Sequence, residues 1–403
     1  MKFICSIIIR ETLTNMCGIL FQVDNKDINI DKFEAALNLQ SWRGPDGQAV
    51  NRIGSKIAVG HVRLAIVDPH KRSNQPFYSS CGKFLITYNG EIYNHLQLRQ
   101  RFNLECRTDS DTETILEGYK DHGLKFLNEL DGMFAFVILD LRNNNYLMCR
   151  DQFGIKPLYL YRSIDQVIAS SECKSINFLK SCSIDTDSIK EWKAIRRPMP
   201  GRTFFNEIEE VPPGAIIYNG SQIGLLCDES NGSKIKRISH LDVLECLDNS
   251  VKAHELGDVE HVALISGGID SSLISSLCTC DKLYTVGQTK NNEFKAAEKT
   301  ANVLNKKLVK LNVTESEIRK AWKHLVLLKG EPLSVPNEAL IYLICRRMNF
   351  KEKVVLTGEG ADELFFGYDN IFRWVLGKSK ITVNEFYSRY TYQQHIDITD
   401  RLF

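Results

Sequence analysis

Paired cysteines and long apolar runs are missing from this 403-residue sequence. The twelve cysteines are scattered, none forms a CxxC pair, and no cysteine or histidine spacing matches a zinc site. We therefore interpret them as reduced thiols, mostly buried, as is usual for proteins inside cells. No apolar stretch approaches the roughly 18 residues that a membrane span needs.

The sequence also lacks an excess of either charge, because its 51 Lys and Arg residues nearly balance its 50 Asp and Glu residues. No long run of one sign occurs, so we expect neither nucleic acid nor a membrane as a partner. The segment before Cys17 holds only a short apolar run and no small-x-small cleavage site. These features predict a cytoplasmic protein.

The length favours two domains, and 43% apolar residues provide material for two cores. The first part of the chain alternates short β-like runs with Gly, Asn and Asp turns, which is typical of stacked antiparallel sheets. Two segments in it have helical spacing of apolar residues, Asp31–Leu39 and Asp111–Leu127. Proline-containing stretches then predict a linker over residues 206–238, between domains at 17–205 and 239–403.

The second part alternates strand-like and helix-like segments, which predicts a doubly wound parallel sheet. Its expected strands are Val259–Ile265, Lys282–Val286, Lys307–Leu311 and Lys353–Leu356, and its expected helices Ser239–His254, Glu293–Asn305 and Glu315–Leu328. In such sheets, sites form at the carboxyl ends of the strands.

A glycine loop, Ser266-Gly267-Gly268-Ile269-Asp270-Ser271-Ser272, follows the first of these strands. Two glycines let the backbone N–H groups approach an anion, and the next helix adds its positive end. The string lacks the lysine of a GxxxxGK[ST] loop. It is similar instead to the PP-loop of ATP pyrophosphatases, which cleave ATP between the α- and β-phosphates. That similarity makes Asp270 a candidate Mg²⁺ ligand.

A second acidic cluster, Thr357-Gly358-Glu359-Gly360-Ala361-Asp362, follows the strand at Lys353–Leu356. Taken alone it is equally typical of a solvated loop that caps a helix. Together with the glycine loop it predicts one shared crevice, with Asp362 as a second candidate metal ligand.

The amino-terminal part contains a candidate nucleophile in Met16-Cys17-Gly18. If Met16 is removed, Cys17 carries a free α-amine that can accept the thiol proton. Other strings fit the binding of free glutamine: Arg63-Leu64-Ala65-Ile66-Val67 for the α-carboxylate, Asn89-Gly90-Glu91 for an oxyanion, and Thr108-Asp109-Ser110-Asp111 for the ammonium.

In order, the strings MCGIL, RGPDG, RLAIV, YNGEIYNH, TDSDTE, LDGMFAF, RDQFGIKPLY, LISGGIDSS and TGEGADELFFGY resemble the glutamine-hydrolysing asparagine synthetase family. The resemblance runs from Met16 to about Tyr368. It implies an α+β N-terminal-nucleophile domain, a four-layer αββα sandwich, followed by an α/β doubly wound PP-loop domain. It also implies ATP and Mg²⁺ as cofactors, glutamine and aspartate as substrates, and a homodimer by analogy.

Residue by residue, the resemblance assigns Cys17 as nucleophile and Asn89 and Gly90 as the oxyanion hole. Glutamine-binding positions are Arg63, Leu64, Ala65, Ile66, Val67, Asn89, Gly90, Glu91 and Asp111. ATP-binding positions are Leu264, Ser266, Gly267, Gly268, Asp270, Ser271, Val286, Thr357 and Gly358. Glu359 matches the acid associated with the β-aspartyl adenylate.

Two departures from the family leave alternatives open. Residues 1–16 precede a cysteine that begins the active form in the family, so we expect translation from Met16, a cleaved propeptide, or an inactive glutaminase. Only 35 residues follow Tyr368, fewer than in the family. The acceptor is therefore aspartate or another carboxylate, such as a sugar acid or a natural-product precursor. A remnant without catalysis, or with glutaminase activity alone, is the further alternative.

Overall fold

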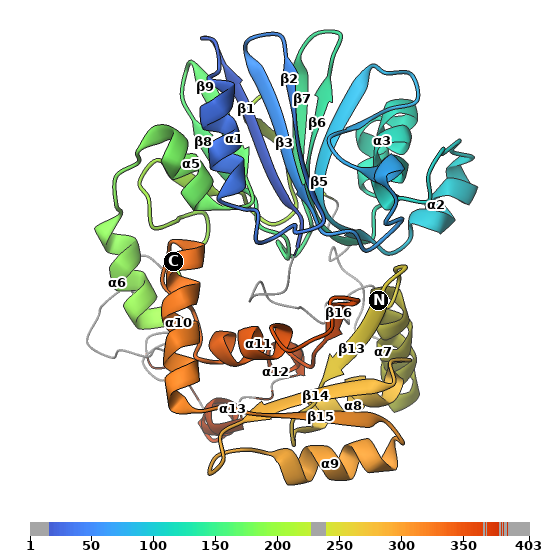
Figure 1. Cartoon of the computed structure of the whole chain (residues 1–403), viewed down its shortest axis with the longest axis vertical. Helices are drawn as coiled ribbons and strands as arrows, with labels where there is room; N and C mark the ends of the chain where they lie inside the picture. Colours follow the sequence, from blue (N-terminus) through green and yellow to red (C-terminus); the bar gives the residue numbers. More distant parts are fainter. Residues whose placement is uncertain are drawn as a thin grey trace.

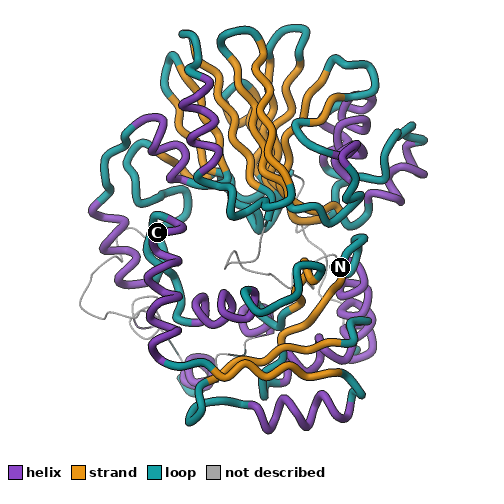
Figure 2. The backbone as a smooth tube through the Cα atoms, in the orientation of Figure 1, coloured by secondary structure: helices purple, strands orange, loops and turns teal. Residues whose placement is uncertain are grey.

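The computed structural model describes residues 16–226, 239–365, 367, 369–378, 380, 382 and 385. A β-sandwich forms one domain, at the top of Figure 1, and a smaller α/β domain lies below it (Figures 1 and 2). The sandwich contains two six-stranded antiparallel sheets, and the α/β domain contains one four-stranded parallel sheet.

The first sheet of the sandwich lies between its partner sheet and three helices. Its strands in spatial order are β10 (Ile208–Glu210), β8 (Tyr159–Arg162), β9 (Gln166–Ser170), β1 (Gly18–Asp24), β3 (Ile57–Arg63) and β2 (Gly47–Ile53). The helices whose side chains pack on its outer face are α1 (Ile30–Asn38), α5 (Cys173–Lys180) and α6 (Thr186–Ile195).

The second sheet carries its helices on the opposite side. Its strands in spatial order are β12 (Ser221–Leu225), β11 (Ala215–Tyr218), β7 (Asn145–Arg150), β6 (Gly132–Asp140), β5 (Phe84–Ile92) and β4 (Phe77–Tyr78). Its helices are α2 (His95–Phe102), α3 (Asp111–His122) and α4 (Leu124–Leu127), and a 3₁₀ turn, η1 (Lys71–Ser73), precedes β4. The layers therefore follow the predicted order αββα.

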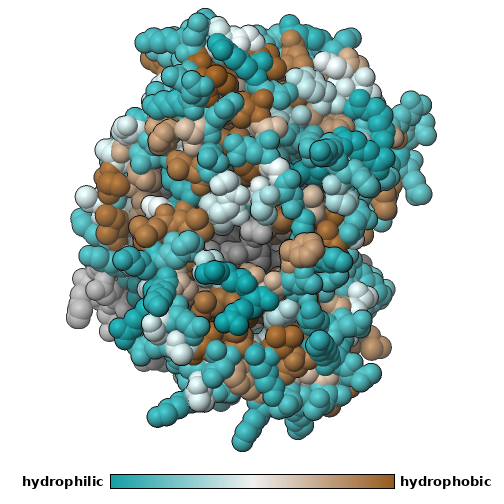
Figure 3. Space-filling view, viewed as in Figure 1, coloured by the Kyte–Doolittle hydropathy of each residue, from teal (hydrophilic) through white to brown (hydrophobic). Residues whose placement is uncertain are grey.

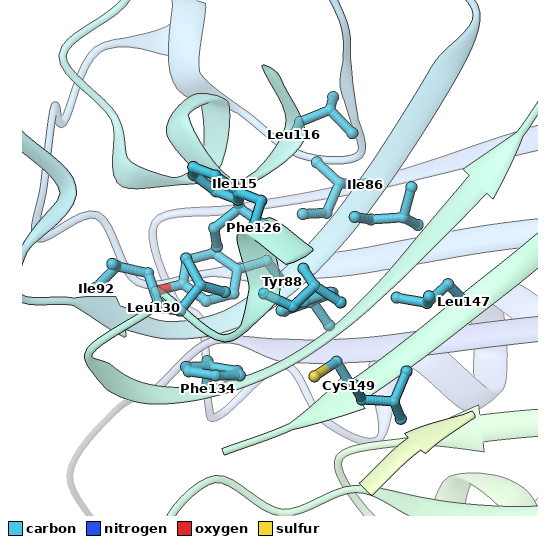
Figure 4. Close-up of a cluster of buried hydrophobic side chains, with 14 of the residues drawn as sticks. Ile86, Tyr88, Ile92, Ile115, Leu116, Phe126, Leu130, Phe134, Leu147 and Cys149 are labelled. Carbon is cyan, nitrogen blue, oxygen red and sulfur yellow. The ribbon is translucent and has the colours of Figure 1, made fainter. Parts of the chain in front are cut away.

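Alternation along β1 shows why the sandwich has this order. Ile19 and Phe21 point between the two sheets, whereas Leu20 packs outward against Phe33 of α1. Successive side chains of a strand face opposite sides, so an apolar strand buried on both faces needs a cover on each. Figure 4 shows the matching cluster outside the second sheet, where Phe126 packs over that sheet.

Two predictions about the sandwich need correction. The helix expected over Asp111–Leu127 is interrupted at Gly123, whose φ of +62° ends α3 before the short α4 begins. The linker expected over residues 206–238 is wrong over 206–226, because β10, β11 and β12 lie within the two sheets. Proline and glycine there form turns between strands of this domain, and residues 227–238 lie outside the described part.

The α/β domain begins with α7 (His240–His254), and its sheet has the order β15-β14-β13-β16. Its strands are β13 (Glu260–Leu264), β14 (Lys282–Gly287), β15 (Lys307–Asn312) and β16 (Glu352–Leu356). The helices are α8 (Ile269–Leu277), α9 (Phe294–Val303), α10 (Glu315–Lys329), α11 (Asn337–Cys345), α12 (Ala361–Phe365) and α13 (Asp369–Leu376).

Helices cover both faces of this parallel sheet. Ala263 and Leu283 pack against α8 and α9, while Val262 and Tyr284 pack on the opposite side with Ile344 of α11. The chain moves outward from β13 through β14 to β15 and then returns to place β16 on the other side of β13. The carboxyl ends of the adjacent strands β13 and β16 therefore mark the topological switch point, where ligands bind in doubly wound sheets.

The domains meet through specific hydrogen bonds. Tyr93 Oη lies 3.0 Å from His254 Nε2, and the Trp192 indole donates to the Leu333 carbonyl at 3.0 Å. Figure 3 shows separate hydrophobic groups among hydrophilic residues on the visible face. Within the described residues, no helix is both long and apolar enough to cross a bilayer. The cysteines of that part of the chain are all free thiols.

Candidate functional site

Cys17 immediately precedes β1, in a backbone arrangement that leaves no room beside it. A Cβ at Gly18 would meet Gln40 Oε1 at 2.8 Å and Val62 Cγ2 at 2.9 Å, so glycine is required next to the cysteine. The Cys17 carbonyl accepts a hydrogen bond from Arg43 Nε at 3.0 Å. These contacts fix the direction in which the thiol points.

A pocket at this end of the sandwich brings together most of the predicted glutamine-site residues. It is lined by Met16, Cys17, Arg63, Leu64, Ile66, Val67, Ser73, Gln75, Tyr88, Asn89, Gly90, Glu91, Ser110, Asp111, Thr112, Met133 and Lys156. Ala65 is not among the lining residues. Its N–H donates to Asp46 Oδ2 at 2.8 Å, and its carbonyl accepts from Lys353 Nζ at 3.4 Å.

Asn89 offers a buried donor to this pocket. Its side chain is 1% exposed, and its Nδ2 has no hydrogen-bond partner within the described part of the chain. Gly90 follows on β5, where a Cβ would lie 2.2 Å from the Met133 carbonyl oxygen. A buried amide without a partner is costly unless a ligand satisfies it, which fits a donor for a developing oxyanion.

Asp111 begins α3 and holds the far side of the pocket in place. Its Oδ2 accepts from Tyr88 Oη at 2.7 Å and from the Ile92 amide at 3.0 Å. Burial and then the charge of Asp111 raise the pKa of Glu91 well above its ordinary value. Burial and the Asp111 charge therefore favour the protonated form of Glu91 over its carboxylate.

The guanidinium of Arg63 already has partners in the neighbouring loop. Nη1 donates to the His70 carbonyl and Asn74 Oδ1, at 2.9 and 2.7 Å, and Nη2 to the Val67 and Asp68 carbonyls, at 3.4 and 2.6 Å. The predicted two-pronged grip on an α-carboxylate would have to replace some of these bonds. In this structure Arg63 shapes the pocket by holding that loop.

Competing influences act on the Cys17 thiol. Burial raises its pKa, while the Leu64 amide and the charges of Arg63 and Lys156 lower it. Sequence reasoning missed Lys156, although it lies inside the quoted string RDQFGIKPLY. It is 4% exposed, and its Nζ lies 3.0 Å from Met16 Sδ. A lysine within an otherwise apolar segment was the available signal.

The two ATP-side loops meet at the switch point, as predicted. A Cβ at Gly358 would lie 2.8 Å from the Ser271 amide nitrogen and 3.1 Å from Asp270 Cβ. The predicted residue Leu264 ends β13, Val286 lies near the carboxyl end of β14, and Thr357 is buried just after β16. The predicted positions thus lie together at the carboxyl ends of neighbouring strands, where doubly wound sheets bind ligands.

The glycine loop is held by its own serines. Ser266 Oγ lies 2.9 Å from Ser271 Oγ and accepts from the Gly268 amide at 3.1 Å. The Gly267 amide donates to Glu293 Oε2 at 3.0 Å, a contact that sequence reasoning missed. The Glu293 carboxylate therefore accepts from a loop amide that is suited to donate to a phosphate oxygen. The available signal in the sequence was Glu293, an acidic residue a few positions beyond the strand that follows the loop.

Asp270 and Asp362 are close enough to influence each other. The pKa of Asp270 is raised by burial and then by the negative charge of Asp362. Two neighbouring carboxylates of this kind fit Mg²⁺, which binds one or two carboxylates together with substrate phosphates. In the described residues, no cluster of three or more His, Cys, Asp or Glu side chains forms a metal site. The amide of Glu359, in the same acidic segment as Asp362, donates to Thr357 Oγ1 at 3.2 Å.

Comparison with known proteins matches both domains. Residues 16–224 match the glutamine amidotransferase domain family, and residues 242–396 match the asparagine synthase family. Asparagine synthetase [glutamine-hydrolyzing] 1 of Bacillus subtilis is 31% identical over 82% of this chain and 54% of its own length. The Sandersonia aurantiaca enzyme is 30% identical over 88% of this chain and 67% of its own.

Asparagine synthetase B [glutamine-hydrolyzing] of Escherichia coli is 30% identical over 88% of this chain and 65% of its own length. The chain therefore spans between about half and two thirds of these relatives. Among solved structures, a glutamine phosphoribosylpyrophosphate amidotransferase from B. subtilis, complexed with ADP and GMP, aligns with a TM-score of 0.41 and 17% identity. The alignment covers 75% of this chain and 70% of that one. By its two matched domains and its relatives, the chain belongs to the glutamine-hydrolysing asparagine synthetase family.

Proposed function

We propose that this protein is a glutamine-dependent asparagine synthetase. It hydrolyses glutamine to glutamate and ammonia, and uses ATP and Mg²⁺ to convert aspartate to asparagine with release of AMP and pyrophosphate. The observation that carries the proposal is the pocket in which the Cys17 thiol lies with the partnerless Asn89 amide, on a sandwich joined to a PP-loop domain. The family of the chain and the names of its relatives support the same reaction.

In the glutaminase half, Sγ of Cys17 attacks the side-chain amide carbon of glutamine. Nδ2 of Asn89 and the N–H of Gly90 stabilise the oxyanion, and ammonia leaves as the thioester forms. Water then releases glutamate and restores the thiol. Asp111 binds the substrate ammonium, and residues 63–67 with Glu91 hold the rest of the amino acid.

In the synthetase half, the loop from Ser266 to Ser271 binds the pyrophosphate portion of ATP, with Leu264, Val286, Thr357 and Gly358 around the nucleotide. Asp270 and Asp362 would hold Mg²⁺, which neutralises phosphate charge when it is bound. Glu359 lies where the acyl-adenylate forms and reacts. Glu293 must release the Gly267 amide before a phosphate oxygen takes that position.

Removal of residues 1–16, up to and including Met16, would complete the glutaminase site. Met16 lines the pocket beside Lys156, so its loss enlarges the pocket and leaves an α-amine on Cys17. That amine is the base the thiol needs. Intact-mass analysis of the active protein is expected to give a chain beginning at Cys17, and glutamine hydrolysis by a chain retaining Met16 would contradict this step.

The decisive experiment supplies the purified protein with ATP, Mg²⁺, aspartate and glutamine labelled with ¹⁵N in its amide. Labelled asparagine and aspartate-dependent pyrophosphate release are the expected products. A Cys17→Ser variant should lose glutamate release but make asparagine from added ammonia, because the ATP site is separate.

The same assay separates the alternatives. Pyrophosphate release that requires a different carboxylate, found in a screen of sugar acids and amino acids, would replace aspartate as the acceptor. Glutamate release without any ATP-dependent amide would leave a glutaminase alone. No turnover of either kind would make the protein a non-catalytic member of the family.

A further inference from the structure

The loop that forms one wall of the glutamine pocket is held from outside by the α/β domain. Leu64, Ile66 and Val67 line the pocket. The Asp258 amide donates to the Ile66 carbonyl at 3.0 Å, and the Asp68 amide donates to Asp258 Oδ2 at 2.9 Å. Asp258 of the α/β domain therefore makes one hydrogen bond on each side of Val67, donating to Ile66 and accepting from Asp68.

Lys353 provides a second attachment to the same loop. Its Nζ donates to Asp46 Oδ2 at 2.6 Å and to the Ala65 carbonyl at 3.4 Å. The same Asp46 oxygen accepts from the Ala65 amide at 2.8 Å. Through this one oxygen, the RGPDG segment (residues 43–47) is hydrogen-bonded both to the pocket loop, at Ala65, and to the α/β domain, at Lys353. The Lys353 and Asp46 side chains are 21% and 29% exposed, so the ion pair is partly shielded from water.

Both attachments lie at the amino ends of the strands that carry the ATP-side loops. Asp258 precedes β13, and Lys353 is the second residue of β16, which pairs directly with β13. The opposite ends of these strands lead into the glycine loop and the Thr357 cluster. The strand pair is therefore a rigid element shared by both sites.

We infer that Lys353 and Asp258 are positioning residues for the glutamine pocket: they hold the 64–68 loop, and through Leu64 the Cys17 thiol, in its reactive arrangement. The inference rests on the proposed glutaminase reaction. Leu64 is the link, because its amide donates to Cys17 Sγ at 3.3 Å. Small displacements of a group that orients a nucleophile lower turnover steeply.

The test uses Lys353→Met, which keeps the aliphatic stem and removes the ammonium, in the full chain. We expect kcat/KM for glutamine hydrolysis to fall on the order of tenfold, mainly through kcat, because the loop orients the Cys17 thiol. Lys353→Arg should restore most of the loss, since its guanidinium can still donate to Asp46. Asparagine formation from added ammonia should not change. Lys351→Met is the matched control, because Lys351 is an exposed lysine two residues away.

A second readout does not depend on turnover. The rate of Cys17 alkylation by iodoacetamide, followed by mass spectrometry of its peptide, should change in Lys353→Met and Asp258→Asn but not in Lys351→Met. Wild-type values of both kcat/KM and alkylation in Lys353→Met would overturn the inference, as would an equal loss of ammonia-dependent synthesis. If the wild-type protein releases no glutamate, the proposed function fails, and the alkylation rates alone decide the positioning role.

Discussion

The amide of Leu64 donates to Sγ of Cys17 at 3.3 Å, while the thiol donates back to the carbonyl of the same residue at 3.6 Å. A thiol can keep both contacts, whereas a thiolate keeps only the first and is repelled by the carbonyl oxygen. The Leu64 amide lowers the pKa of Cys17 against the effect of burial, so it stabilises the thiolate that forms when the proton is removed. Nearby positive charge decides how easily that happens.

Loss of the Lys156 charge should change the acidity of the Cys17 thiol. Its charge lowers the pKa of Cys17 against the effect of burial, so Lys156→Met is expected to move the midpoint of Cys17 alkylation to higher pH. Lys156→Arg should keep the midpoint close to that of the wild type. Peptide mass spectrometry across a pH series measures both, and an unchanged midpoint in the methionine variant would exclude this electrostatic role.

Asn89 should act on the transition state for glutamine hydrolysis. Asn89→Ala removes the partnerless Nδ2 donor, so kcat should fall about 10²- to 10³-fold with little change in KM. Asn51→Ala is the control, because Asn51 lies on β2 and its amide donates to Tyr78 Oη, away from the pocket. A variant that loses only affinity for glutamine would assign Asn89 to substrate binding.

Gly44 and Gly47 make a matched pair within the RGPDG string. A Cβ at Gly44 would lie 2.3 Å from the backbone nitrogen of Arg63, whereas a Cβ at Gly47 would meet nothing within 4 Å. Gly44→Ala should therefore lower the free energy of unfolding by about 1–3 kcal/mol, through forced backbone movement, and impair glutamine hydrolysis. Gly47→Ala should leave both unchanged. If the two substitutions change the free energy of unfolding equally in denaturant titrations, the close approach of Gly44 to Arg63 does not determine stability.

His61 should make the sandwich sensitive to acid. Burial, with a smaller effect of Arg63, lowers its pKa from 6.5 to about 3. Below pH 6.5 the unfolded chain binds a proton that the folded chain does not, so stability present at higher pH is lost as pH falls toward 3. One such proton corresponds to about 1.4 kcal/mol per pH unit. His61→Gln should show a shallower decline between pH 6.5 and 4, measured by urea unfolding, and identical slopes would refute the assignment.

Asp270 should be needed for the ATP-dependent half alone. Asp270→Asn is expected to abolish pyrophosphate release while glutamine hydrolysis continues, because the Cys17 pocket is built from the other domain. In the absence of Mg²⁺ the variant should be at least as heat-stable as the wild type, since it relieves the repulsion from Asp362. Asp281→Asn, at an exposed site before β14, provides the control.

The sequence by itself was sufficient for the two domains, most strands and the main site strings. Alternating apolar residues in β1 and the strand-loop-helix order around Ser266 are local patterns, and local patterns specify local structure. The strand predicted over Lys282–Val286, for example, is β14, which runs from Lys282 to Gly287. The linker prediction failed because the Pro and Gly signals around residues 212–214 mark turns between strands as readily as they mark a domain boundary.

Tertiary structure decided the relationships among distant residues. Local patterns do not indicate that Lys353 reaches Asp46, that Lys156 faces Cys17, or that the four Nη hydrogen bonds of Arg63 go to its own loop. These contacts depend on which sheet edges and loops meet after folding. Propensity and periodicity report a residue's own segment, whereas burial, pKa and partners follow from the packing of segments far apart in the chain.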